Sequence, residues 1–188
     1  MKNLCRAQFK KGFTLVELLV VIAILAILAV AVVLVLNPAE LLKQARDSTR
    51  ISDMAALNSA VALYFADVAP STQSAVVRCT VDTTFPGGGT ACVLNVSTTV
   101  DGTGWVSIPF SSISSGSPLA RLPLDPVNSG VLFYAAKVSS TVGAYELNAN
   151  MESVKYSSTS ASEVVSATKD GGNNAGWYEV GSSLAQTW

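Results

Sequence analysis

The stretch Lys10-Lys11-Gly12-Phe13-Thr14-Leu15-Val16-Glu17-Leu18, with the apolar run that continues it to Leu36, decides the fold of this 188-residue chain. No charged residue occurs from Leu18 to Leu36. A helix over residues 13–36 is about 36 Å long at about 1.5 Å per residue, which exceeds the roughly 30 Å hydrocarbon core of a bilayer. We therefore expect a transmembrane helix here.

The charges before this run indicate its orientation. Four basic residues and no acidic residue precede it: Lys2, Arg6, Lys10 and Lys11. By the positive-inside rule the start of the chain stays cytoplasmic and the residues after Leu36 lie outside. An ordinary secretory signal peptide cut near Ala29-Val30-Ala31 would share the basic start. The length of the run and the presence of Glu17 argue against that interpretation and against a plain membrane anchor.

Glu17 is the unusual residue of the segment. A carboxylate near the bilayer core costs roughly 2.5–3.5 kcal/mol, so such a residue is expected to have a function. Cleavage between Gly12 and Phe13 would create a positive amine at Phe13. Residues four apart share a helix face, so Glu17 could neutralise this amine in its own chain or in a neighbouring chain. Pairing between chains would fix their register.

These residues closely resemble the N-terminal motif of type IV pilins and type II secretion pseudopilins, a class III signal peptide. In that motif a short basic leader ends in Gly and precedes Phe-Thr-Leu-Val-Glu-Leu and a long apolar helix. The resemblance implies that a prepilin peptidase cuts after Gly12 and methylates Phe13. It also implies that the helix anchors the precursor in the cytoplasmic membrane and later forms the core of a filament.

The resemblance implies an α+β type IV pilin fold, in which a long N-terminal α-helix packs against a small antiparallel β-sheet head. It implies as partners other pilin subunits, the prepilin peptidase, and an inner-membrane assembly platform with its ATPase. After assembly the chain would lie in an extracellular or periplasmic filament. We expect four segments: a cleaved leader (1–12), the transmembrane and filament-core helix (13–36), an amphipathic second half of the helix (37–69) and a Ser/Thr/Gly-rich head (70–188).

The sequence Asn37-Pro38-Ala39-Glu40 predicts a helix restart, with Asn37 as N-cap, Pro38 at the first position and Glu40 reaching back. If the helix instead runs through, Pro38 removes a backbone hydrogen bond and kinks it. In type IV pilins a proline near this point marks where the helix can unwind in the filament. A simple boundary between membrane and periplasm is the alternative.

A second helical stretch is predicted over about residues 38–67. Its apolar stripe would comprise Leu42, Ala45, Met54, Ala55, Val61, Tyr64 and Phe65, and the other side carries Lys43, Arg46, Asp47, Arg50 and Asp53. Asp47 and Arg50 could pair within the helix. The charged side is interpreted as a solvated face, with contacts to a neighbouring subunit as the alternative.

The head is predicted from a shift in composition after Pro70. Strands are expected at 105–110, 131–138 and 143–149, the last two as a hairpin, and 151–157 and 177–180 could extend the sheet. One face of the sheet would be buried and the other wet. The turn Leu122-Pro123-Leu124-Asp125-Pro126 resembles the one before the sheet of major pseudopilins and some bacterial pilins, although turn chemistry alone explains it.

The cysteines favour a disulfide in the head. Cys5 lies in the expected leader, and Cys79 and Cys92 enclose a turn-rich segment that contains Pro86-Gly87-Gly88-Gly89. A disulfide would close a loop of about 14 residues, worth nearly 3 kcal/mol. Two free thiols or half of a metal site are the alternatives, but no second Cys or His pair could complete a zinc site. A location outside the cytoplasm favours the disulfide.

The composition argues against an enzyme and against nucleic-acid binding. The chain has no histidine, the commonest general base, and shows neither a phosphate-cradling Gly-Lys loop nor a Cys-based dyad. Loss of residues 1–12 removes four of the 12 basic side chains and none of the 13 acidic ones, which leaves eight against 13 and a side-chain charge of −5. Nucleic acids require a basic patch, so we expect no direct binding to them.

The segment Lys169-Asp170-Gly171-Gly172-Asn173-Asn174 raises the question of calcium, because an acidic loop near the C-terminus binds calcium in major pseudopilins. Asp170 is the only carboxylate of the segment, and Asn173 and Asn174 could add carbonyl oxygens. Calcium takes about six to eight oxygens, often several of them anionic. We therefore interpret the segment as a flexible loop and expect no cofactor, with calcium as the alternative.

The sequence thus predicts a structural subunit of a type IV pilus. The alternatives are a pseudopilin of a type II secretion system and a minor or competence pilin. The loop between Cys79 and Cys92 and the single carboxylate of the 169–174 segment favour a pilin over a major pseudopilin.

Overall fold

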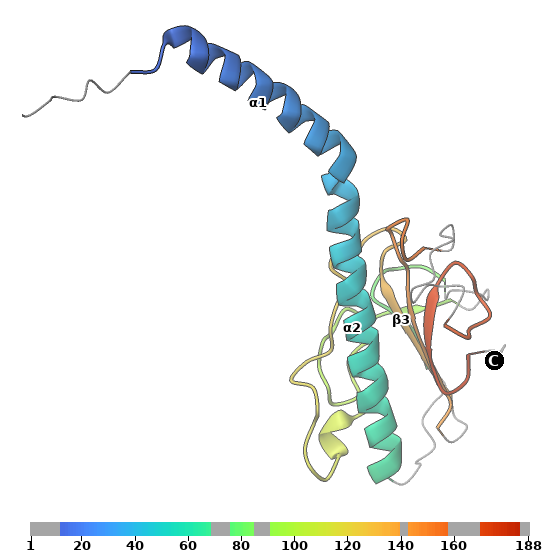
Figure 1. Ribbon diagram of the computed structural model, residues 1–188. Helices are drawn as coiled ribbons and strands as arrows, with labels where there is room; N and C mark the ends of the chain where they lie inside the picture. Colours follow the sequence, from blue (N-terminus) through green and yellow to red (C-terminus); the bar gives the residue numbers. More distant parts are fainter. Residues whose placement is uncertain (1–11, 69–75, 85–90, 140–142, 158–169, 185–188) are drawn as a thin grey trace, which may run out of the picture. The chain divides into compact units, whose positions relative to one another are not determined.

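The structure, a computed structural model, describes residues 12–68, 76–84, 91–139, 143–157 and 170–184. Figure 1 shows the helices and strands of these segments, an α+β combination as expected. Contacts divide the chain into two compact units, Met1–Leu41 and Leu42–Trp188. Several features named above lie outside the described residues: Cys5 with the leader up to residue 11, the Gly-rich segment 86–89, the centre of the hairpin connection at 140–142, and Lys169.

Helix α1 (Leu15–Leu36) makes up most of the first unit. Its stretch Leu15–Val33 has a mean hydropathy of 3.2 and is long enough to cross a membrane. A helix that is apolar on all sides needs a protein core or a membrane around it. None of the side chains in that stretch is buried within the protein, so the helix is suited to a bilayer or to neighbouring copies.

The helical chain is interrupted at Asn37, which has a left-handed conformation with φ of 39° and closes α1. Helix α2 (Pro38–Asp67) begins at the next residue. The amides of Glu40 and Leu41 donate to the carbonyl oxygen of Asn37 at 3.0 and 3.3 Å, so the same residue starts the first turn of α2. The helix therefore restarts at Pro38, and the alternative of one continuous kinked helix is wrong for this chain.

The second unit contains a five-stranded sheet in the order β2-β1-β3-β4-β5. Its strands are β1 (Val76–Cys79), β2 (Val93–Leu94), β3 (Tyr134–Val138), β4 (Tyr145–Ala149) and β5 (Tyr178–Gly181). Neighbours pair antiparallel except β1 and β2, which are parallel. The predicted small antiparallel sheet on a long helix is thus confirmed except at this edge, where Cys92 is bonded to Cys79 and β2 runs parallel to β1.

The predicted β3–β4 hairpin and the extension of the sheet at β5 are confirmed. The predicted strand at 105–110 is wrong: this stretch has only an isolated bridge between Asp101 and Pro109, and a short 3-10 helix, η1 (Phe110–Ser112), follows. Residues 151–157 form a turn and not a strand. Trp105 and Phe110 are nevertheless fully buried.

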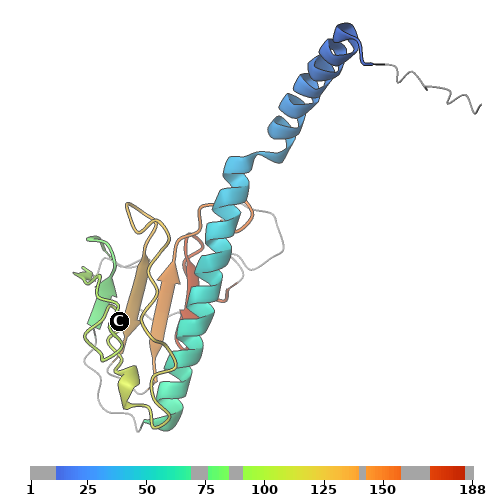
Figure 2. The same cartoon turned by 90° about the vertical axis from the view of Figure 1, so that its left-hand side faces the viewer.

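From residue 42 onwards, α2 lies along one face of the sheet (Figures 1 and 2). The apolar side chains of α2 that are buried there are Met54, Leu57, Ala60, Val61 and Tyr64. Leu42, Ala45 and Ala55 of the predicted stripe are exposed. The predicted stripe is wrong at these positions: at the start of α2 the buried side chains are the charged Asp47 and Arg50, and beyond them the buried positions are those of Met54 and Leu57.

The central strands are buried on both faces. Every residue of β3 and β4 is buried. On the face away from α2, Phe133, Ala135 and Cys79 form a second small core. Trp177, which precedes β5, packs on it, with its ring 4.8 Å from that of Phe133. The predicted wet outer face is therefore wrong for these strands, because the segment before β5 covers it.

Candidate functional site

The N-terminal segment places the expected cleavage point outside the helix. Phe13 is 85% exposed, and Gly12 has no neighbouring atom within 4 Å of the position that a side chain would take. Thr14 has an extended backbone, with φ of −80° and ψ of 151°, and α1 begins only at Leu15. The peptide bond between Gly12 and Phe13 is therefore exposed and lies just ahead of the first helical turn, where a peptidase could bind it.

Glu17 has a partner in this uncut chain that the sequence analysis missed. The backbone amide and the hydroxyl of Thr14 both donate to Oε2 of Glu17 at 2.9 Å. In return the amide of Glu17 donates to Oγ1 of Thr14 at 3.2 Å. This is a capping box, and its signal was present in the sequence as Thr-x-x-Glu before an apolar run. The box aligns the carboxylate at the first turn of α1, four residues from Phe13.

Pro38 is the first residue of α2 and is exposed, directly after the left-handed Asn37. A proline at this position loses no helical hydrogen bond, because the first amides of a helix have no partner within it. The role of Pro38 in filament assembly stays a prediction.

In the head, Arg50 is the centre of a buried ionic cluster with Asp47, Asp125 and Glu152. Its Nε and Nη2 donate to the two oxygens of Asp125 at 2.6 and 2.9 Å. Its Nη1 donates to Asp47 at 2.7 Å and to Glu152 at 2.8 Å. The side chains of Arg50, Asp47 and Asp125 are fully buried. The predicted solvated face of α2 is therefore wrong at these positions, whereas the predicted pairing of Asp47 with Arg50 is confirmed.

The same cluster holds two loops of the head. Oδ1 of Asp125 accepts the amides of Val127 and Asn128 at 2.8 and 3.0 Å, which closes the turn noted in the sequence. Asp47 accepts the amides of Glu152 and Ser153 at 3.1 and 2.8 Å. The turn at Asp125 thus does more than reverse the chain, because its carboxylate also receives the guanidinium from α2.

Glu152 extends the cluster toward the surface. Arg46 donates to its two oxygens at 2.5 and 2.8 Å. The hydrogen bonds from Arg46 lower the pKa of Glu152, and Arg50 adds to them against the opposing effect of burial, so that this pKa lies at about 2. Sequence reasoning could not have found this cluster, because Arg50 is 75 residues from Asp125 and 102 from Glu152.

Cys79 and Cys92 are joined by a disulfide, with their Cα atoms 5.5 Å apart. Cys79 is fully buried in the small core beside Phe133 and Ala135, and Cys92 packs against that core. The bond ties β1 to the residue that precedes β2. The disulfide alternative, and not two free thiols or half of a metal site, is the one that the structure contains.

The 170–174 segment uses its carboxylate for backbone contacts. The two oxygens of Asp170 accept the amides of Gly172 at 2.9 Å and of Glu179 at 2.6 Å. Asn174 accepts the amide of Gly176 at 3.1 Å, and Asn173 is exposed. Within the described segments no group of three or more acidic, Cys or His side chains is placed to hold a metal ion. The calcium alternative stays a prediction.

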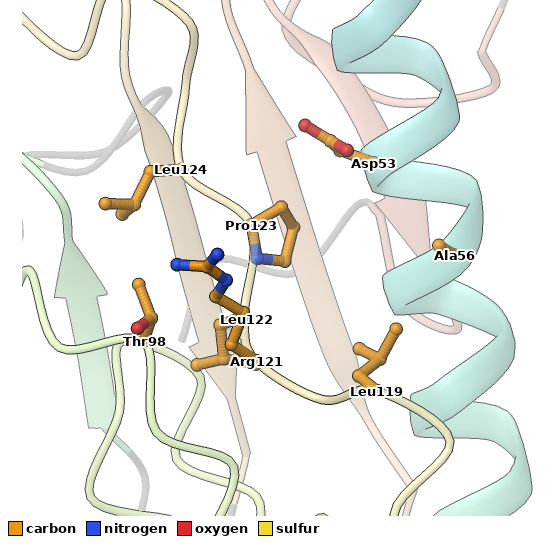
Figure 3. Close-up of a pocket in the computed structure, with 8 residues that line it drawn as sticks. All are labelled: Asp53, Ala56, Thr98, Leu119, Arg121, Leu122, Pro123 and Leu124. Carbon is orange, nitrogen blue, oxygen red and sulfur yellow. The ribbon is translucent and has the colours of Figure 1, made fainter.

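A cavity of about 390 Å³ lies between α2 and the segment that leads into the Asp125 turn (Figure 3). Its lining is mostly apolar, with Asp53 and Arg121 as the two charged members: Asp53, Ala56, Thr98, Leu119, Arg121, Leu122, Pro123 and Leu124. Burial raises the pKa of Asp53, and its Oδ2 accepts the hydroxyl of Tyr134 at 2.8 Å. The described residues that line this cavity include neither a nucleophile next to a base nor a metal-ligand set.

Comparison with known proteins assigns the N-terminal segment. Residues 8–33 match the family described as the prokaryotic N-terminal methylation motif. The match supports a class III signal peptide of the type IV pilin-like kind at the start of the chain, as in a pilin-like or pseudopilin precursor. Members of this family are structural proteins, processed by a prepilin peptidase and polymerised with other pilins. No curated protein and no solved structure matches the chain.

Proposed function

We propose that this chain is the prepilin of a type IV pilus: it is cleaved after Gly12, N-methylated at Phe13 and polymerised through its N-terminal helix. The observation that carries the proposal is the arrangement at the start of α1. An exposed Gly12–Phe13 bond and the extended Thr14 stand directly before a capped apolar helix whose first turn holds Glu17.

Cleavage changes the electrostatics of this arrangement. It turns the amide of Phe13 into an amine that can be positively charged, four residues before Glu17. In the uncut chain the carboxylate is occupied by Thr14. After the cut it can also neutralise the amine of Phe13, in its own chain or in a neighbour, which lowers the cost of a charge in an apolar surrounding. Pairing between chains would align the exposed helices in one register.

The processed chain would pass from the cytoplasmic membrane, with its N-terminus inside, to a filament outside it. This route requires the prepilin peptidase and an inner-membrane assembly platform with its ATPase. We assign no catalytic activity and no cofactor to the chain itself. The apolar side chains of Leu15–Val33, none of which is buried within the protein, support this route, since they need first lipid and then neighbouring helices to cover them.

A type II secretion pseudopilin or a minor or competence pilin would share the processing but not the product. The disulfide between Cys79 and Cys92, and the use of Asp170 for backbone contacts, favour the pilus subunit over a major pseudopilin.

The test is mass spectrometry of filaments sheared from cells, with the membrane fraction of the same cells as the control. We expect abundant chain in the filaments, beginning at a methylated Phe13. The same modified N-terminus found solely in the membrane fraction would favour a pseudopilin or a minor subunit. A start at another residue, such as one just after Ala31, would refute the processing itself.

A further inference from the structure

The sheet carries a buried polar layer on the face away from α2. Lys137, Glu146, Asn148 and Glu179 are 8%, 4%, 0% and 1% exposed. They come from three adjacent strands, and the register places Lys137 opposite Glu146 and Asn148 opposite Glu179. Alternate residues of β3 and β4 face α2, so these four side chains share the other face. Buried ionisable groups need partners, and this layer does not supply all of them.

Among the residues that the structure describes, two buried oxygens of the layer have no hydrogen-bond donor: Oδ1 of Asn148 and Oε1 of Glu179. The Asn148 amide nitrogen donates to Oε1 of Glu146 at 2.8 Å, and Oε2 of Glu179 accepts the amide of Asn174 at 2.8 Å. Exchanging the amide oxygen and nitrogen of Asn148 would bring its oxygen against the Glu146 carboxylate, so this exchange does not supply the missing donor. The described residues thus leave one hydrogen-bond donor missing between β4 and β5.

A proton on Glu179 would supply that donor. Burial is the largest cause that raises the pKa of Glu179, to about 7, and the hydrogen-bonding contact with Glu146 and the charge of Asp170 raise it further, against the amide of Asn174. The charged groups that face Glu179 among the described residues are Lys137 from β3, Glu146 from β4 and Asp170 from the preceding loop. Two of these three are acids, and burial lowers the pKa of Lys137.

We propose that Glu179 carries a proton in the folded head and donates it to an acceptor on β4, so that detachment of β5 is coupled to release of this proton. Loop 170–176 contacts the same carboxyl group: the amide of Asn174 donates to Oε2 of Glu179, and Gly172 lies so close that a side chain there would collide with that of Glu179. The proton thus stabilises the attachment of β5 and its preceding loop to the sheet. The proposal goes beyond the assembly function and holds whichever kind of filament the chain builds.

Because detachment of β5 releases the proton of Glu179, the stability of the attached β5 depends on pH. In a detached β5, Glu179 has an ordinary pKa of 4.5, against about 7 in the sheet. The equilibrium constant for attachment of β5 is therefore largest below about pH 4.5. It falls by up to about tenfold per pH unit as the pH rises toward 7, and it falls no further above that pH.

The test is hydrogen exchange of the full-length chain in detergent micelles, followed by mass spectrometry. We expect the protection factor of β5, corrected for the intrinsic pH dependence of exchange, to fall by close to tenfold per pH unit between about pH 5 and pH 7. Peptides from the Met54–Val61 part of α2 are the internal reference. Glu179→Gln is neutral and carries its own N–H donor, so its β5 protection should not depend on pH in this range. Asp82→Asn, at an exposed carboxylate, should behave as the unchanged chain.

A second measurement detects the proton of Glu179 directly and so separates its loss from an effect of the substitution on folding. The infrared carbonyl band of a protonated carboxylic acid should be present at about pH 6 and absent in Glu179→Gln, because Glu179 is expected to be still protonated there. Absence of this band in the unchanged chain, or an unaltered pH slope in Glu179→Gln, would overturn the proposal. So would a change in β5 protection on adding a chelator at that pH, because a metal ion would then take the place of the proton.

Discussion

Arg50 of α2 and Asp125 of the turn before β3 form a two-pronged, fully buried ion pair, with Nε–Oδ2 and Nη2–Oδ1 distances of 2.6 and 2.9 Å. The guanidinium geometry matches the carboxylate, and its remaining nitrogen Nη1 serves Asp47 and Glu152. One arginine thus links the helix to two separate loops of the head.

Removal of Arg50 should be among the most damaging single changes in the head. Arg50→Ala leaves the carboxylates of Asp47 and Asp125 buried without a counter-charge, and breaking such pairs costs about 3–5 kcal/mol. Arg50→Lys should recover only part of this, because an ammonium group cannot make the two-pronged contact. The measurement is the free energy of unfolding of the full chain in urea, followed by tryptophan fluorescence.

Arg121→Ala is the matched control for this series, since it removes an exposed arginine at the rim of the cavity. Its effect should stay within about 0.5 kcal/mol, as is usual for surface positions. A loss below about 1 kcal/mol in Arg50→Ala would mean that water reaches the cluster and that it does not hold the head.

Glu152 should make the head sensitive to acid. Its pKa is lowered from 4.5 to about 2 by the hydrogen bonds from Arg46, so its contribution to stability is present above about pH 4.5 and is lost as the pH falls toward about 2. We expect Glu152→Gln to be less stable near pH 7 and to lose less stability between about pH 4.5 and pH 2. The measurement is the urea midpoint across this range. If the urea midpoint of Glu152→Gln fell with decreasing pH as steeply as that of the unchanged chain, other carboxylates would be the cause of the acid sensitivity.

Two substitutions of Glu17 should separate its role in the capping box from its charge. Glu17→Gln can keep the box with Thr14, because Gln serves at this position, but it cannot neutralise the amine of Phe13. We expect Glu17→Gln and Glu17→Ala to insert into the membrane normally and to be strongly reduced in sheared filaments. Immunoblots of the membrane and sheared fractions give the comparison, with Asp82→Asn as the control. Normal filament yield from Glu17→Gln would show that Glu17 acts through the helix cap alone.

The disulfide should contribute nearly 3 kcal/mol to the stability of the head. It closes a loop with a sequence separation of 13 between Cys79 and Cys92, and about 3 kcal/mol is the entropic value for a loop of this size. The paired change of both cysteines to Ser should lower the free energy of unfolding by about 2–3 kcal/mol, measured in urea without reductant. Cys5→Ser removes a thiol that takes no part in the bond and should leave the value unchanged. If the paired variant were as stable as the unchanged chain, the pairing of β2 with β1 alone, and not the disulfide, would hold β2 in the sheet.

The local features of the chain could be predicted because neighbouring residues determine them. The apolar run after Phe13 is sufficient for α1, Asn37-Pro38 is sufficient for the restart of the helix, and the two β-rich runs joined by a short connection form β3 and β4. The capping box of Thr14 and Glu17 was equally local, and the Thr-x-x-Glu spacing would have predicted it.

Tertiary structure decided which polar residues are buried. The pattern of α2 indicated a charged, solvated side, because a sequence cannot tell a charge that faces water from one whose partner lies far along the chain. Arg50 is buried because Asp125, 75 residues away, and Glu152, 102 residues away, are brought to it. Glu179 is buried because β5 pairs with β4 and the preceding loop covers the sheet. By itself the sequence determined the membrane helix, the processing motif and the helix restart, which depend on contiguous residues. The ionic cluster and the polar layer exist only where distant segments meet and exclude water.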